Sequence, residues 1–392
     1  MYDYLLWILV SSAIAFWLES LRRYRNKPFR ALHRKAWGHP WPRRYNTISR
    51  AEIGRLDDGD EIYVNVDDGV DHFDYCCLED IEEVCRALAA NTGLQDVIVM
   101  RQEYEEILSR LYHYPPGDPL RFKLFVITGQ QGIGKTCFLV YHLLYRLERR
   151  LPTAVQVDNK RYFIFDHYGA TLHSTDAASS QSVISRLNEC WVLCDSNSFV
   201  TQPCEELQAY AATLMLTTLP KPEWRKMMEK MYAADSEVLV VDLPTVMEIA
   251  AAVKELKLDT TATLGWIGKW GPTFRTIISL LRRPGYVDRM HSAVEDAANT
   301  LTNSPLTTAV INSDVGRLPT ESSSSLLFVG LNHERKTVLC IPTRYLADIF
   351  TRQVSSVQKR ASHPLTQQRD CRLVPRDCNT HADAGPETSR AS

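Results

Sequence analysis

The sequence predicts an α/β fold in which a glycine-rich loop joins a strand to a helix. An apolar run at 122–127 leads through Thr128 into this loop, and apolar side chains three and four positions apart follow at 137–150. The first pattern is typical of a buried strand and the second of an amphipathic helix. Further apolar runs of strand length lie at 161–166, 191–194, 212–216 and 237–243. Helical spacing at 245–256 and 276–283 supports the same mixed class.

The glycine-rich loop matches the phosphate-binding pattern G-x-x-x-x-G-K-[ST]. Glycine suits it because a backbone without Cβ atoms can curl its N–H groups around a phosphate chain. We expect Lys135 to reach the β- and γ-phosphates of ATP or GTP, Thr136 to hold Mg²⁺, and the helix N-terminus to favour the anion. The predicted nucleotide-binding residues are Gly129, Gln130, Gln131, Gly132, Ile133, Gly134, Lys135, Thr136 and Cys137.

The apolar run Trp191–Cys194 ends at Asp195, as a Walker B strand would. Its carboxylate is expected beside Thr136, where both would hold the Mg²⁺ shell. The alternative is an Asp that caps a turn. Ser196 follows, where many ATPases place a Glu that polarises the attacking water. Either another polar group such as Asn197 positions that water, or turnover is slow and the nucleotide acts chiefly as a switch.

Two later segments carry candidate phosphate contacts. Thr217 and Thr218 end the run that starts at Ala212, where they would sense a γ-phosphate, with charge added by Lys221, or simply cap the strand. The turn Gly271-Pro272 gives Arg275 a fixed aim from the first turn of a helix, and a guanidinium suits a phosphate well. Arg275 on the open surface is the alternative. The predicted catalytic residues are Lys135, Asp195 and Arg275.

These segments together resemble the NTPase module of Crinkler-type and retrotransposon-hot-spot proteins, in the form abundant among basidiomycete fungi. The similarity runs from about Asp96 to Phe350, on the segments Val97–Tyr104, Ile127–Thr136, Val192–Ser196, Thr217–Pro220, Gly271–Arg275, Ser323–Val329 and Ile341–Leu346. It implies a three-layer P-loop NTPase sandwich of AAA-like or STAND-like type. It also implies Lys135 and Thr136 at the phosphates, Asp195 as Walker B and Arg275 as a sensor. The chain departs from the family at Leu219-Pro220, where Ser-Pro is usual.

Charge and cysteine usage narrow the setting. The net charge is −2, which gives no general indication of nucleic acid as a partner. Ten cysteines without a C-x-x-C pair favour a reducing compartment and argue against a cysteine metal site. Charge is uneven along the chain: 22–50 holds ten Lys/Arg and no acid, whereas 52–83 holds thirteen acids and one Arg.

The N-terminal segment leaves two interpretations open. Residues 4–18 are almost all apolar and a basic run follows, so the segment either spans a membrane with the body of the protein in the cytoplasm, or packs on the protein as a helix. A cytoplasmic protein is expected in both cases, with a nucleoside triphosphate as its ligand. A homo-oligomer that supplies an arginine in trans is compatible with such folds.

The predicted organisation has five parts. Residues 1–50 hold the apolar segment and basic run, 51–120 an acidic α+β region, 121–258 the P-loop NTPase core, 259–350 a C-terminal lid of helices and a small α+β extension, and 351–392 a disordered tail. The predicted function is a Mg²⁺-dependent NTPase that acts as a conformational switch. The alternative is a nucleotide-binding effector or interaction scaffold with little or no turnover.

Overall fold

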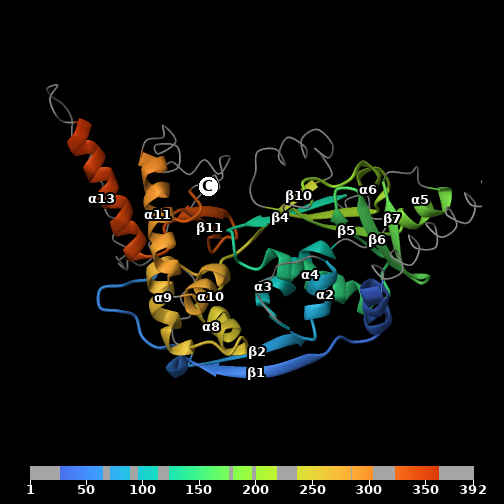
Figure 1. The fold of residues 1–392 in the computed structure, drawn as a ribbon, viewed down its shortest axis with the longest axis horizontal. Helices are drawn as coiled ribbons and strands as arrows, with labels where there is room; N and C mark the ends of the chain where they lie inside the picture. Colours follow the sequence, from blue (N-terminus) through green and yellow to red (C-terminus); the bar gives the residue numbers. More distant parts are fainter. Residues whose placement is uncertain are drawn as a thin grey trace, which may run out of the picture.

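The computed structural model describes residues 27–64, 71–88, 96–113, 123–175, 180–196, 200–218, 236–283, 285–302 and 323–361 (Figure 1). Its centre is a seven-stranded sheet with the strand order β10-β4-β9-β8-β5-β6-β7. The first five strands are parallel, and β6 and β7 extend the sheet as an antiparallel pair. Their bounds are β10 Ser236–Val241, β4 Leu124–Gly129, β9 Thr213–Thr217, β8 Trp191–Asp195, β5 Thr153–Asp158, β6 Arg161–Asp166 and β7 Gly169–Ser174.

Helices cover both faces of this sheet. In β4, Phe125 and Ile127 pack with α4 (Lys135–Glu148), whereas Leu124 and Val126 pack on the opposite side with α5 (Gln181–Leu187) and α6 (Glu205–Tyr210). Strands buried on both faces must be apolar throughout, which is why the sequence shows them as continuous apolar runs. The predicted three-layer α/β fold of P-loop NTPases is confirmed.

Two elements of the large sheet differ from the sequence prediction. Neither β5 nor β7 is among the strands that the apolar runs predicted. β7 forms because β6 turns back on itself: the Asp166 carboxylate accepts the Tyr168 N–H at 2.9 Å, and Gly169 takes a positive φ of 108°. The residues of β7 are mostly half-buried and largely polar, so the sequence shows no continuous apolar run there.

A second sheet has the antiparallel order β1-β2-β3, with β1 Arg43–Ser49, β2 His72–Glu79 and β3 Val97–Val99. One correction follows. The predicted boundary at residue 50 divides this sheet, since β1 lies before it and β2 after it. Leu78 pairs with Arg43 in the sheet, and the short helix α2 (Glu82–Ala87) follows it. Arg44 of β1 contacts Glu79 and Glu255, so part of the basic run serves internal ion pairs.

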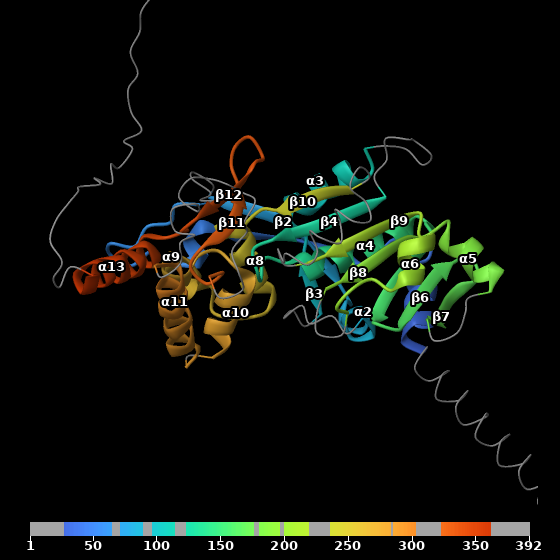
Figure 2. The same ribbon diagram turned by 90° about the horizontal axis from the view of Figure 1, so that it is seen from above.

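The C-terminal helices gather at one end of the large sheet, and β1 and β2 run beneath both parts (Figures 1 and 2). One face of the small sheet packs on α8, α9 and α10. The remaining helices are an unlabelled one at 27–36, α3 Gln102–Leu111, α8 Val246–Glu255, α9 Thr263–Trp270, α10 Phe274–Arg282, α11 Tyr286–Thr302 and α13 Arg344–Ala361. The strands β11 Phe328–Leu331 and β12 Thr337–Cys340 form a hairpin, and two short 3-10 helices lie at Arg50–Ile53 and Thr260–Ala262.

The predictions for the two ends of the chain can be compared with the structure only in part, because the described residues run from 27 to 361. The predicted disordered tail begins inside α13, since this helix continues through residue 350 to Ala361. The rest of the tail and the apolar segment 4–18 lie outside the described residues. Among the helices that are described, none is both long enough and apolar enough to cross a membrane.

Candidate nucleotide-binding site

The glycine-rich loop leaves the carboxyl end of β4 at Gly129 and enters α4 at Lys135. Gly129, Gly132 and Gly134 all have positive φ angles, of 135°, 81° and 101°. Close neighbours add a second requirement for glycine. A Cβ atom on Gly132 would lie 2.7 Å from the Cβ of Arg275, and one on Gly134 would collide with the Tyr104 hydroxyl. The tight curl of the loop therefore depends on residues without a side chain.

Lys135 lies folded back on its own loop. Its ammonium group donates to the carbonyl oxygens of Gly129 at 3.0 Å and Gln130 at 2.6 Å. Burial of the ammonium, together with repulsion from Arg275, lowers the pKa of Lys135 to about 7, although Asp195 opposes the shift. The side chain must leave these carbonyls to reach a phosphate.

Thr136 and Asp195 are brought together as the strand pattern predicted. The Thr136 hydroxyl donates to Oδ2 of Asp195 at 3.0 Å. The other carboxylate oxygen accepts the Thr217 hydroxyl from the end of β9, the strand between β4 and β8. A hydroxyl and a carboxylate at the mouth of a phosphate loop are hard oxygen ligands of the kind that Mg²⁺ prefers. These residues therefore fit a Mg²⁺ site.

The other candidates next to Asp195 are placed less completely. The Ser196 N–H donates to the Thr217 carbonyl at 2.8 Å, so this serine continues the sheet edge. Thr218 is buried and its N–H donates to Ile127. Asn197 and Lys221 lie outside the described residues.

Arg275 starts α10 directly against the loop. Its backbone N–H donates to the Gly132 carbonyl at 3.3 Å, and the Thr273 side chain caps the helix. Gly271 has a φ of 79° and packs against Phe328 of the hairpin, which fixes the turn before the helix. Arg275 is exposed, and within the described part of the chain its side chain has no hydrogen-bond or ion-pair partner. It is therefore available to an anion at the loop.

The side chains of three loop residues serve the fold. Gln130 is 3% exposed; its amide nitrogen donates to the Ser324 carbonyl at 2.6 Å, and its amide oxygen accepts the Val329 N–H at 3.2 Å. Ile133 and Cys137 are buried, and burial raises the pKa of the Cys137 thiol to about 12. These residues have only backbone groups to offer a nucleotide. Gln131, by contrast, is exposed.

Sequence reasoning missed two residues that touch the loop from outside it. Arg101 donates to the Ile133 carbonyl at 3.2 Å, and the Tyr104 hydroxyl donates to the Gly134 carbonyl at 2.9 Å. Both lie in the segment Val97–Tyr104, which the family resemblance included without giving it a role. An Arg and a Tyr at the start of an amphipathic helix carry no signal that separates such contacts from surface positions.

Comparisons with known proteins add little at the level of sequence. No protein-family model matches the chain, and no curated protein matches it. The resemblance to Crinkler-type proteins therefore stays a prediction.

Several solved structures are similar to this chain in fold. They include the RuvB Holliday junction branch migration motor of Thermotoga maritima, the S. cerevisiae Hsp104–ADP complex and AMPPCP-bound DnaA from Aquifex aeolicus. Sequence identities are 15%, 11% and 10%, and TM-scores are 0.29, 0.32 and 0.34. The matches cover 50%, 73% and 67% of this chain, and 64%, 41% and 90% of those chains. The chain thus spans less than two thirds of the first two proteins. Because these TM-scores are low, the fold assignment rests on the strand order and the loop.

Proposed function

We propose that the protein binds ATP or GTP with Mg²⁺ at Gly129–Thr136 and hydrolyses it as a conformational switch. The observation that supports this most directly is the 3.0 Å contact between the Thr136 hydroxyl and the Asp195 carboxylate. A phosphate loop alone would bind an anion, whereas the added carboxylate supplies the second oxygen ligand that a metal–nucleotide complex needs.

Each side chain in this proposal has a distinct task. Lys135 binds the β- and γ-phosphates, and Thr136 and Asp195 hold the metal, whose charge offsets that of the phosphate oxygens. Thr217 orients the carboxylate through its hydroxyl. Arg275 would supply a guanidinium from the first turn of a capped helix, whose backbone is bonded to Gly132.

One observation favours a second candidate, a nucleotide-binding scaffold with little turnover. Ser196 stands directly after Asp195, and a serine is too weak a base to draw a proton from the attacking water. Hydrolysis would then depend on another group, and a slowly hydrolysed nucleotide would hold the protein in one state.

The test of the first proposal is titration of a fluorescent ATP analogue with Mg²⁺ against wild type, Lys135→Ala and Lys123→Ala. Lys123 is exposed directly before β4, at the opposite end of the strand from the loop, so its substitution removes one positive charge without touching the loop. We expect Lys135→Ala to lose affinity and Lys123→Ala to keep it. Equal affinity in all three proteins would contradict nucleotide binding at the loop.

Phosphate release decides between the two candidates. Steady release that Asp195→Asn abolishes would support the NTPase switch. Nucleotide that co-purifies and is released unhydrolysed after hours would support the scaffold. Competition by unlabelled ATP and GTP identifies the base that the site prefers.

A further inference from the structure

Three consecutive carbonyl groups of the glycine-rich loop are held from its outer side. The Gly132 carbonyl accepts the backbone N–H of Arg275 at 3.3 Å. The Ile133 carbonyl accepts a guanidinium N–H of Arg101 at 3.2 Å. The Gly134 carbonyl accepts both the Tyr104 hydroxyl and, as the first bond of α4, the Phe138 N–H, each at 2.9 Å. Apart from Phe138, the donors come from two distant parts of the chain, the start of α3 and the start of α10, so this side of the loop is enclosed by the surrounding fold.

Holding a carbonyl also sets the direction of an N–H group. In a trans peptide the C=O of one residue and the N–H of the next lie in one plane and point in opposite directions. The N–H groups of residues 133, 134 and 135 must therefore point away from Arg275, Arg101 and Tyr104. Successive N–H groups on one side of a turn form a concave site for an anion.

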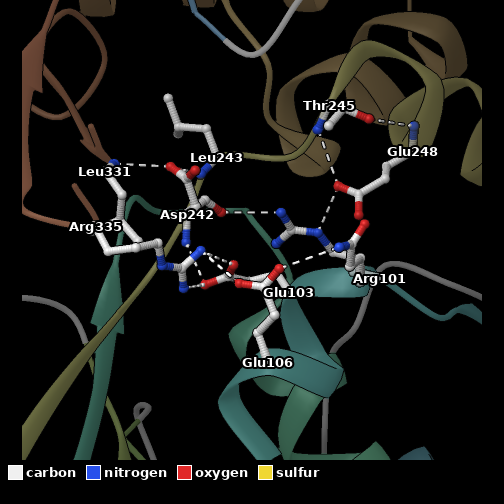
Figure 3. A network of polar contacts seen from close by, with 10 residues as sticks. Arg101, Glu103, Glu106, Asp242, Leu243, Thr245, Glu248, Leu331 and Arg335 are labelled. Atoms are coloured by element: carbon white, nitrogen blue, oxygen red, sulfur yellow. Dashed lines mark hydrogen bonds and ion pairs between the residues drawn. The ribbon is translucent and has the colours of Figure 1, made fainter. Parts of the chain in front are cut away.

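Each of the three guanidinium nitrogens of Arg101 donates a hydrogen bond. Besides Ile133, Arg101 donates to the Glu248 carboxylate at 2.9 Å and to the Asp242 carbonyl at 3.1 Å (Figure 3). It is 2% exposed, and the rings of Tyr104 and Phe274 lie 5.7 and 5.9 Å from its guanidinium carbon. A buried arginine with all of its contacts defined positions a neighbouring carbonyl more rigidly than a surface side chain would.

Tyr104 complements Arg101 from one helical turn further on. Its ring is 1% exposed and packs against Phe138 of α4, so the hydroxyl meets the loop at a fixed point. Burial raises the pKa of this hydroxyl well above its usual range, so the group stays protonated and donates. The same hydroxyl is the atom that a Cβ on Gly134 would strike.

We propose that Arg101 and Tyr104 are positioning residues of the nucleotide site, which hold the carbonyls of Ile133 and Gly134 outward so that the next two N–H groups face the phosphates. The inference rests on the proposed function and deepens it. It makes the segment before β4 part of the site, without contact to the nucleotide.

The experiment compares Tyr104→Phe with Tyr141→Phe. The Tyr141 hydroxyl donates to Glu105 at 3.1 Å and its ring stacks on that of Tyr104, but among the described residues no hydrogen bond joins the Tyr141 hydroxyl to the loop. Both variants keep the ring and lose one hydroxyl hydrogen bond. Affinity for the fluorescent ATP analogue and for inorganic tripolyphosphate, each with Mg²⁺, is measured in both, together with the urea midpoint.

We expect Tyr104→Phe to bind both ligands about three- to tenfold more weakly than wild type, since the Gly134 carbonyl loses one of its two hydrogen bonds and the N–H behind it is held less firmly. The factor should be the same for both ligands, because the affected group faces phosphate and not the base. Tyr141→Phe should bind as wild type does. Arg101→Lys, which keeps the charge beside Glu248 but not the fork, should weaken phosphate binding at least as much.

The outcomes separate the two levels of inference. If wild type binds and Lys135→Ala does not, while Tyr104→Phe and Arg101→Lys bind as tightly as Tyr141→Phe, the positioning role is refuted and the proposed function stands. A fall in the urea midpoint of Tyr104→Phe with unchanged affinity would show a purely structural role and also refute it. If wild type and Lys135→Ala bind equally, the proposed function fails and the inference fails with it.

Discussion

The unusual state of Lys135 predicts that nucleotide binding takes up a proton. In the free protein, burial and then repulsion by Arg275 lower the pKa of Lys135 to about 7, from an ordinary value near 10.5. Phosphate charge stabilises the ammonium, so binding raises this pKa again. Above pH 7 the lysine must gain a proton in order to bind, and affinity must therefore fall as the pH rises.

The size of the effect follows from the pKa. At pH 8, one unit above the folded pKa, only about one lysine in eleven is protonated, so binding should take up roughly 0.9 proton and the affinity should be about tenfold below its limit at low pH. A further unit of pH should cost about another factor of ten, as long as the pKa in the complex stays higher. The stability of the free protein has the opposite dependence: the unfolded chain holds the extra proton between pH 7 and 10.5, so stability rises with pH across that window.

Isothermal titration with a non-hydrolysable ATP analogue and Mg²⁺ measures the uptake directly. At pH 8 the phosphates, with a second pKa near 6, are already ionised and add little to the proton count. Titrations in two buffers of different ionisation enthalpy should give heats that differ by about 0.9 times the difference between the buffers. Lys135→Arg is the control, because its guanidinium does not titrate in this range. Equal heats in both buffers for wild type, or the same proton uptake in Lys135→Arg, would refute the reasoning.

Three further predictions concern the contacts around the site. Asp195→Asn should weaken Mg²⁺-dependent binding by about 10- to 100-fold with an unchanged unfolding midpoint, whereas Asp166→Asn, which loses a buried ion pair near the far edge of the sheet, should lower the midpoint and leave the Mg²⁺ dependence intact. The reverse pattern would move the metal site to Asp166. Gln130→Leu should lower the free energy of unfolding by about 1–3 kcal/mol, since two backbone groups of the C-terminal segment lose their partner; a urea midpoint equal to wild type would contradict this. Arg335 contacts both Glu103, whose side chain is 7% exposed, and Glu106, whose side chain is 43% exposed. Glu103→Gln should therefore lower the free energy of unfolding by about 1.5–3 kcal/mol, and Glu106→Gln by less than about 1 kcal/mol. Equal losses in the two variants would contradict the burial argument.

The strand–loop–helix conformation and the position of Asp195 beside it could be predicted because their signals are local. Gly129–Thr136 is a contiguous pattern, and the strand that ends at Asp195 shows itself as a short apolar run that stops at an acid. The parallel register that places this acid beside Thr136 then follows from the fold, since Asp195 ends β8 and the loop that leads to Thr136 leaves the carboxyl end of the parallel strand β4. Short-range patterns of this kind survive in a single sequence.

What could not be predicted depends on contacts between residues far apart in the chain. The partners of Gln130 lie almost two hundred positions away, so nothing near the loop indicates that its side chain is buried. β1 looks like part of a basic run in the sequence, because the acids that pair with Arg43 and Arg44 are the distant Glu148 and Glu255. A charged strand whose partners are distant looks like a solvated segment until the fold brings the acids to it.

The contacts of the loop also limit how a nucleotide-driven switch can work. Lys135 holds the Gln130 carbonyl, and the Gln130 side chain holds the segment that begins β11. When the Lys135 ammonium moves to a phosphate, the Gln130 carbonyl loses its hydrogen-bond donor. The side chain of the same residue, Gln130, holds the C-terminal hairpin through its two hydrogen bonds. The second connection runs from Gly132 to the backbone of Arg275, at the start of α10. Both lead from the loop into the C-terminal helices and hairpin, whereas Arg101 fixes the loop to α8 through a buried ion pair. In the proposed switch, the fixed contact lies on the Arg101 side, and a change of nucleotide is transmitted through Gln130 and Arg275.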